Sequence, residues 1–241
     1  METLLPLYDP APSPLLGELL DTPPLRRLAD VGMNCGCEYT AFPLFARTLP
    51  YSRRDHSAGA ARIVWHFTAS PAQAAAALLH DVATPVFAHT VDFLHGDHLR
   101  QESTEADTAA VIAASPEVTA VLARYGLDTA DVSDYHRYPI ADNDSPRLSA
   151  DRLEYTLGNL FHYGFADLTH LSAFYRDLTV SAGEDGQPEL AFRTPEIAED
   201  FALAALQTGR VYVCDEDRFA MEALAALLRD TLDRGVLTPQ T

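Results

Sequence analysis

The stretch Leu78-Leu79-His80-Asp81-Val82-Ala83-Thr84-Pro85-Val86-Phe87-Ala88-His89 decides how this chain is interpreted. It follows an alanine-rich run, residues 73–77, that is apolar enough to form a buried helix. A histidine and an aspartate side by side at the end of a buried helix are costly to desolvate unless a partner compensates them. A divalent metal ion is such a partner, because imidazole and carboxylate together suit iron, manganese, zinc and similar ions. The stretch therefore predicts a metal site at the end of this helix.

The pattern on either side of this stretch predicts an all-α fold. Apolar residues recur at helical spacing after Ser52, and Ser70-Pro71 and Ser149 are typical helix starts. The segment Gly183–Gly186 between short apolar stretches predicts one small β-hairpin near residues 180–192. We expect a single domain over residues 1–241, with a core at about 20–165 and a C-terminal helical subregion at about 166–241. The expected helices cover residues 25–31, 52–67, 72–80, 87–94, 102–114, 117–125, 150–163, 167–176, 195–208 and 216–235.

Composition narrows the class of protein. Of the 241 residues 47% are hydrophobic, which is enough for a sizeable core, and the net charge of −18 argues against a basic nucleic-acid-binding face. All 17 basic residues are arginine, so a bound phosphate must be held by arginine, histidine, backbone amides or a metal. The chain has no apolar run of about 18 residues and its first residues do not resemble a secretory signal, so we expect a soluble, cytoplasmic protein. Three cysteines (Cys35, Cys37 and Cys214) fit a reducing compartment.

Further ligands for the predicted metal occur at the starts of two other helices. His56 opens the helix that precedes the His80 helix, and Asp151 opens the long helix after Ser149. With His80 and Asp81 they form the order H…HD…D. This order resembles the HD-domain metal-dependent phosphohydrolases, a helical superfamily whose metal ligands follow one another in this way. The resemblance implies an HD-type helical bundle in which His56, His80, Asp81 and Asp151 bind a divalent metal ion.

Local motifs bring the resemblance closest to the deoxynucleoside triphosphate triphosphohydrolases. That family has Pro-x-Phe-x-His after the HD pair, which is similar to Pro85–His89 here. Its Arg-x-x-His-Ser motif resembles Arg53-Arg54-Asp55-His56-Ser57, and its Asp-Ala-Asp-Arg-Leu-Asp-Tyr segment resembles Ala150–Tyr155. The likeness spans roughly residues 20–165, whereas the C-terminal third matches only as helices.

The chain departs from that family at several positions. Ala83-Thr84 stands where the family has Gly-His, and Gln101 stands where the family has its second catalytic histidine. Glutamine cannot give a proton to a leaving oxygen as an imidazolium can. These departures motivate an alternative, a catalytically altered HD-fold protein that binds nucleotide as a regulatory or assembly subunit. A dinuclear oxygenase would need two more histidines, but His89, His95 and His98 follow Asp81 too closely for that branch, and only His136 lies further on.

The residues around the predicted ligands suggest catalytic roles. Two histidines and two aspartates leave open positions for water and a phosphate oxygen. Arg53 and Arg152 flank the ligands in sequence, and each could clamp a phosphoryl group, although Arg152 could instead pair with Glu102 or Glu154. His89 could act as an acid or phosphate donor, or serve in packing.

Two further residues are candidates for contact with the rest of the substrate. Tyr155 follows Asp151 by four residues and could stack on, or hydrogen-bond to, a sugar, or it could belong to the core. Asn159 stands where the resembled family has an aspartate near the sugar.

These observations predict a metal-dependent phosphohydrolase that acts on a nucleotide or a related phosphate ester. The expected catalytic residues are Arg53, Asp81 and His89, and the expected substrate-binding residues are Arg53, Arg152, Tyr155 and Asn159. Histidine and aspartate accept Mn, Mg, Fe, Co, Ni or Zn, so the pattern does not choose the metal. The expected partner is a small nucleotide or phosphate ester rather than a nucleic acid polymer or a membrane. The resemblance also implies a homo-oligomer.

Overall fold

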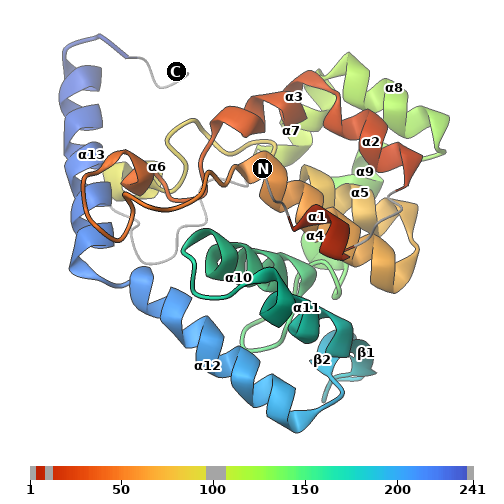
Figure 1. Ribbon diagram of the computed structural model, residues 1–241. Coiled ribbons are helices and arrows are strands. Elements are labelled where there is room, and N and C mark those ends of the chain that lie inside the picture. Colours follow the sequence, from red (N-terminus) through yellow and green to blue (C-terminus); the bar gives the residue numbers. More distant parts are fainter. Residues whose placement is uncertain (1–3, 9–12, 96–106, 238–241) are drawn as a thin grey trace.

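The computed structural model describes residues 4–8, 13–95 and 107–237, apart from the side chains at positions 92, 93 and 95. Helices make up most of the described chain, with one two-stranded sheet (Figure 1). The helices are α1 Leu5–Tyr8, α2 Pro14–Leu20, α3 Pro23–Arg27, α4 Arg53–Thr68, α5 Pro71–Leu79, α6 Thr90–His95, α7 Thr108–Ala114, α8 Pro116–Arg124, α9 Thr129–Val132, α10 Ala150–His162, α11 Leu168–Asp177, α12 Pro195–Val211 and α13 Asp215–Asp233, with 3₁₀ turns η1 Leu28–Asp30, η2 Cys37–Tyr39 and η3 Tyr135–Arg137.

Helices α4, α5 and α10 form the centre of the fold, where α4 packs against both of the others (Figure 1). A serine side chain fixes where each of the three begins. Ser52 and Asp55 form a reciprocal capping box at α4, and Ser70 and Ser149 accept hydrogen bonds from backbone N–H groups in the first turns of α5 and α10. These caps therefore fix the first turns of the three helices that carry the predicted metal ligands.

The hydrophobic core lies around these three helices. The alanine run Ala74–Ala77 in α5 is buried, and its short side chains let α5 pack closely against α4. In α10 the apolar positions Leu153, Leu157 and Leu160 are fully buried. One large cluster of buried side chains extends from helices α1 and α2 through this centre to α11, the sheet and α12.

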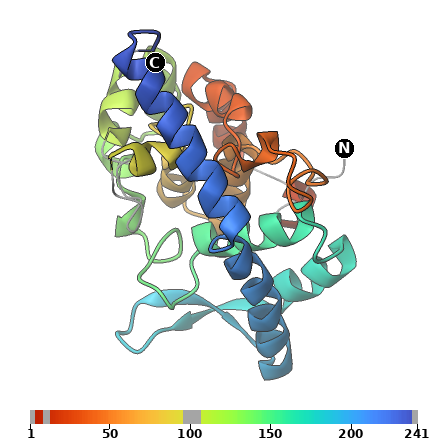
Figure 2. The same cartoon turned by 90° about the vertical axis from the view of Figure 1, so that its left-hand side faces the viewer.

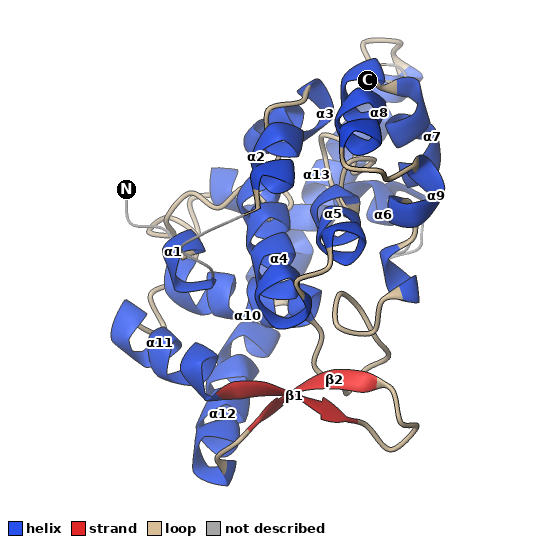
Figure 3. Cartoon of the chain, turned by 90° about the vertical axis from the view of Figure 1, so that its right-hand side faces the viewer, coloured by secondary structure: helices blue, strands red, loops and turns tan. Residues whose placement is uncertain are grey.

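The C-terminal part adds the sheet and two long helices. Strands β1 (Leu178–Ala182) and β2 (Pro188–Phe192) pair antiparallel, and Leu190 forms a bridge with Leu148 just before α10 (Figure 3). Helix α13 crosses the face of the molecule seen in Figure 2 and packs against α6 and η2. A second, smaller apolar cluster holds it there, formed by Cys37, Phe45, Val211, Ala220, Met221 and Ala225.

The predicted all-α fold with one small hairpin is confirmed. Its strands, at residues 178–182 and 188–192, enclose the predicted turn. The helix expected over residues 102–114 is described only from Thr108 onward, and α9 and η3 lie between 128 and 145, outside the expected helices. Within the described residues, no helix is both long enough and apolar enough to cross a membrane.

Candidate metal centre

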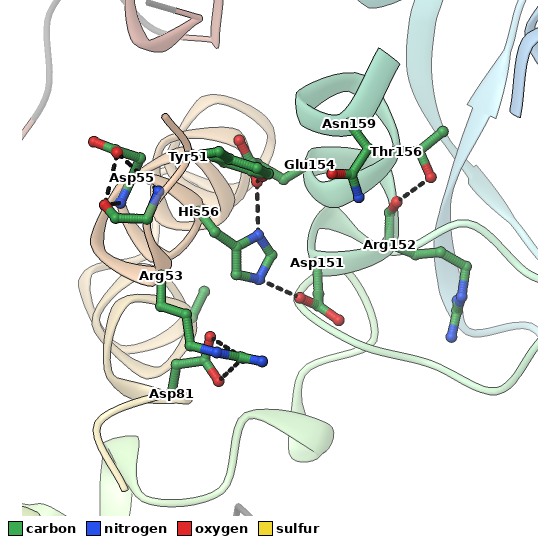
Figure 4. A network of polar contacts seen from close by, with 12 residues as sticks. Tyr51, Arg53, Asp55, His56, Asp81, Asp151, Arg152, Glu154, Thr156 and Asn159 are labelled. Atoms are coloured by element: carbon green, nitrogen blue, oxygen red, sulfur yellow. Dashed lines mark hydrogen bonds and ion pairs between the residues drawn. The ribbon is translucent and has the colours of Figure 1, made fainter. Parts of the chain in front are cut away.

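Three predicted metal ligands, His56, His80 and Asp151, meet between α4, α5 and α10, and Figure 4 shows His56 facing Asp151. His56 lies in the first turn of α4, His80 caps the C-terminus of α5, and Asp151 lies in the first turn of α10. His56 Nε2 is 2.9 Å from Asp151 Oδ1, and His80 Nε2 is 3.5 Å from the same oxygen. One ligand atom from each residue lies within 4.8 Å of the others, so the group could hold a metal ion.

Asp81, the fourth predicted ligand, lies beside this group and is bound to Arg53. Arg53 Nη1 donates to both carboxylate oxygens of Asp81, at 2.9 and 3.0 Å. The Oδ2 atom of Asp81 is 3.6 Å from His80 Nε2, and both members of the ion pair are about 95% buried. Burial alone would raise the pKa of the Asp81 carboxyl, but the charge of Arg53 and the nearby histidines hold that pKa well below its usual range. Asp81 therefore stays ionised next to the three-residue group.

Thr84 explains part of how Asp81 is held. Its side chain is fully buried and its hydroxyl donates to Asp81 Oδ1 at 2.8 Å. The residue that replaces the histidine of the resembled family is thus a hydrogen-bond donor to the Asp81 carboxylate.

A buried glutamate that the sequence interpretation did not assign to the site lies behind His56. Glu154 Oε2 is 2.6 Å from His56 Nδ1, and the glutamate is only 2% exposed. Burial lowers the pKa of His56, but hydrogen bonds to Asp151 and Glu154 and their charges outweigh it and raise the pKa to about 10. In the metal-free protein His56 is therefore an imidazolium between two carboxylates.

The candidate metal centre opens into a pocket of about 360 Å³. The predicted residues Arg53, His89, Tyr155 and Asn159 line it together with His56, His80, Asp81 and Asp151. The sequence interpretation missed the part of its wall that comes from the end of the chain, formed by Tyr212, Asp217, Arg218 and Met221. Helix α13 and the turn before it therefore complete a pocket whose metal end is built by the centre of the fold.

Tyr155 and Asn159 continue from Asp151 along one face of α10, at spacings of four residues. Burial, with a further contribution from Asp151, raises the pKa of Tyr155 to about 12, so its hydroxyl keeps its proton. Asn159 Nδ2 donates to the Tyr212 hydroxyl at 2.7 Å, while the buried Oδ1 has no hydrogen-bond partner within the described residues. The wall of the pocket thus offers both aromatic surface and polar atoms.

Arg152 does not line this pocket. Its guanidinium turns away from His56 and Asp151 (Figure 4) and donates to Asn143 Oδ1 at 3.0 Å and to the backbone carbonyls of Asn143 and Arg147. Glu154, one of the partners considered for it, is bound to His56 instead. The structure therefore places Arg152 as a support for the loop before α10.

Several other candidates lie elsewhere. His136 pairs with Asp142 at 2.7 Å and is not among the residues that line the pocket. Gln101, Glu102 and His98 lie outside the described residues, as does the side chain of His95.

Comparison with known proteins supports the metal-dependent phosphohydrolase interpretation. No family model matches the chain. It is 26% identical over 151 residues to a protein of Cordyceps militaris named metal-dependent phosphohydrolase cns2, a match that covers 63% of this chain and 42% of the relative. It is also 27% identical over 170 residues to the uncharacterized protein YdhJ of Bacillus subtilis, covering 70% of this chain and 50% of the relative. The chain spans half or less of the length of these curated relatives.

The likeness to the protein named metal-dependent phosphohydrolase agrees with the His56, His80 and Asp151 group, which could hold a metal ion. The narrower likeness to deoxynucleoside triphosphate triphosphohydrolases stays a prediction.

Proposed function

We propose that this chain is a metal-dependent phosphohydrolase of the HD type that hydrolyses a phosphate ester of a nucleotide. The observation that carries the proposal is the convergence of His56, His80 and Asp151 at one end of a pocket that also contains a buried arginine. The likeness to a metal-dependent phosphohydrolase supports the same reaction class.

The residues at the metal end fit a divalent ion. Two imidazole nitrogens and the carboxylate of Asp151 form a donor set accepted by Mn, Fe, Co, Ni and Zn, and Asp81 would add a second carboxylate. When bound, such an ion supplies a water molecule of lowered pKa as nucleophile and screens the negative charge of the phosphate.

Arg53 is the candidate phosphate ligand. It is 5% exposed, lines the pocket, and carries a buried Nε–H that has no hydrogen-bond partner within the described residues. Its guanidinium can donate to a phosphoryl oxygen while Nη1 stays on Asp81, which would fix the phosphate next to the metal ligands. His89 lines the same pocket and is the candidate that delivers a proton to the leaving oxygen.

The lining of the pocket also suits the nucleoside part of a nucleotide. Four tyrosines line it, Tyr135, Tyr155, Tyr163 and Tyr212, and they provide aromatic faces with polar edges. Asn159 offers one amide atom without a partner among the described residues, which a sugar hydroxyl could engage. The volume of about 360 Å³ falls within the range of small-molecule sites.

A substrate screen tests this proposal. The purified chain is loaded in turn with Mn²⁺, Co²⁺, Ni²⁺, Mg²⁺, Fe²⁺ and Zn²⁺ and offered nucleoside mono-, di- and triphosphates beside simple non-nucleotide phosphate esters. We expect release of orthophosphate or polyphosphate from at least one nucleotide, and no release by a His80→Ala variant. A protein that holds metal yet releases nothing from any nucleotide would overturn the proposal.

One observation favours a second candidate, a nucleotide-binding HD-type protein without turnover. The Thr84 hydroxyl is committed to Asp81, so the position that is histidine in the resembled family offers no cationic donor to a phosphate. This candidate predicts that nucleotide raises the melting temperature without any release of phosphate.

A further inference from the structure

The carboxylate of Glu154 is the acceptor in a buried network between α4 and α10. The Tyr51 hydroxyl donates to Oε2 at 2.5 Å and the Tyr8 hydroxyl donates to Oε1 at 3.2 Å. His56 Nδ1 lies 2.6 Å from Oε2, so three groups surround one carboxylate, two of which, Tyr51 and His56, are seen in Figure 4. Tyr8, Glu154 and His56 are each at most 2% exposed, and water therefore does not compete for these bonds.

Two helical glycines make room for this network. A Cβ atom at Gly59 in α4 would come within 2.5 Å of Glu154 Oε1 and 2.6 Å of its Cγ. A Cβ atom at Gly158 in α10 would lie 2.5 Å from Tyr51 Cζ. Glycine is among the least favourable residues inside a helix, so both positions lose helical stability. Because neither glycine has a Cβ, the glutamate and the tyrosine ring can lie close to the helices that carry these glycines.

We propose that Glu154 is a positioning residue that fixes the tautomer and orientation of His56 for metal binding. The Glu154 carboxylate accepts hydrogen bonds from both tyrosine hydroxyls, and as an acceptor toward His56 it has the imidazole present the N–H of Nδ1. The lone pair used to bind a metal is then confined to Nε2, the atom that faces Asp151. The inference rests on the proposed metal centre and adds a residue to it.

The network also connects the start of the described chain to the metal centre. The backbone carbonyl of Tyr8, at the end of α1, accepts a hydrogen bond from the Tyr175 hydroxyl at 2.7 Å and lies 2.9 Å from His66 Nδ1. Tyr8 is thus held on two sides, and its hydroxyl is directed at Glu154. Tyr51 is likewise fixed, because its ring stacks on His162 with centroids 4.3 Å apart. Glu154 is therefore bound by groups that are themselves immobilised.

The affinity for Co²⁺, measured by calorimetry on the metal-free full chain, tests this role, and the visible absorption of bound Co²⁺ reports ligand geometry. We expect Glu154→Gln to bind Co²⁺ about 10–100-fold more weakly and with a changed spectrum, because an amide can also donate to Nδ1 and so permit the wrong tautomer. Gly59→Ala should also weaken binding by displacing the carboxylate. Gly209→Ala is the matched control, since a Cβ at this α12 glycine meets nothing within 4 Å.

The outcomes separate this role from the proposed reaction. Weak Co²⁺ binding by a folded Glu154→Gln protein supports the positioning role whether or not the parent releases phosphate. Parent-like affinity and spectrum in that variant would overturn the role and leave the metal centre intact. Absence of Co²⁺ binding by the parent would overturn both. If Glu154→Gln does not fold, Tyr51→Phe takes its place, with an expected several-fold loss of affinity, and parent-like binding by it would overturn the role.

Discussion

Replacing Arg53 by methionine tests whether Asp81 faces the metal. The change removes the arginine partner of a carboxylate that is 4% exposed, so in the metal-free protein Asp81 loses its largest counter-charge. Breaking a buried ion pair in this way costs about 3–5 kcal/mol. The Thr84 hydroxyl still donates to Asp81, so we expect the lower end, about 3 kcal/mol, which lowers the melting temperature of a chain of this size by about 6–12 °C.

A bound divalent ion should reverse most of this loss, because it replaces the guanidinium as the counter-charge of Asp81. The variant should then bind Mn²⁺ more tightly than the parent, by up to about 100-fold if the full 3 kcal/mol or so is recovered. Thermal unfolding with and without saturating Mn²⁺ measures this effect, and the Mn²⁺-induced rise in melting temperature should be larger in Arg53→Met than in the parent.

Arg54→Met is the control for this experiment. Arg54 is adjacent in sequence but its guanidinium donates to the Leu20 carbonyl at 3.2 Å rather than to a carboxylate. The Arg54→Met protein should lose about 1 kcal/mol of unfolding free energy, and Mn²⁺ should raise its melting temperature as much as it raises that of the parent. If Mn²⁺ raised the melting temperature of Arg53→Met no more than that of Arg54→Met, Asp81 would not contact the ion, and the reasoning would be refuted.

Two further predictions concern His56 and Arg152. The raised pKa of His56, about 10 against 6.5 in the unfolded chain, stabilises the metal-free protein fully below pH 6.5, and this stabilisation is lost as the pH rises toward 10. A metal must displace the Nε2 proton of His56, so the apparent Mn²⁺ affinity should rise about tenfold per pH unit between about pH 6.5 and 8.5. Calorimetry in two buffers should detect one released proton, and a Mn²⁺ affinity that does not change with pH would contradict this prediction. Arg152→Ala should lower the melting temperature, because it removes the bonds to Asn143 and Arg147, yet leave the KM for the substrate unchanged. A tenfold rise in KM would restore Arg152 as a phosphate ligand.

The sequence predicts the centre of the fold well because its signals there are local. Ser52, Ser70 and Ser149 mark helix starts through bonds to residues three positions away, and the structure has these bonds. The hairpin is also encoded locally, by the turn at residues 183–186 between two short apolar stretches.

Helical geometry explains why one arginine was misplaced and one glutamate overlooked. Arg152 follows Asp151 directly, so it lies about 100° around the helix and points away from the metal side. Glu154 follows Asp151 by three residues and shares its face, but a glutamate in a helix is usually a surface residue. The spacing was therefore available as a signal, whereas the burial of Glu154 was not.

The contribution of the C-terminal helices could not be predicted in the same way. Asp217 and Met221 reach the pocket only because α13 packs against α6 and η2, far away in sequence. Neither residue belongs to a local motif, and α13 alone is an ordinary amphipathic helix. The sequence thus indicates the predicted metal ligands of the pocket, whereas the residues that α13 contributes to its lining depend on tertiary packing.

Counting bound ions tests the metal centre itself. The parent, His56→Ala, His80→Ala, Asp151→Ala and the control His170→Ala are dialysed against Mn²⁺, and metal per chain is measured by mass spectrometry. His170 suits as a control because it is partly exposed in α11 and pairs with Asp200. We predict close to one ion per chain in the parent and in His170→Ala, and a large loss in each of the other three. Full occupancy in His56→Ala, His80→Ala and Asp151→Ala would contradict the metal centre.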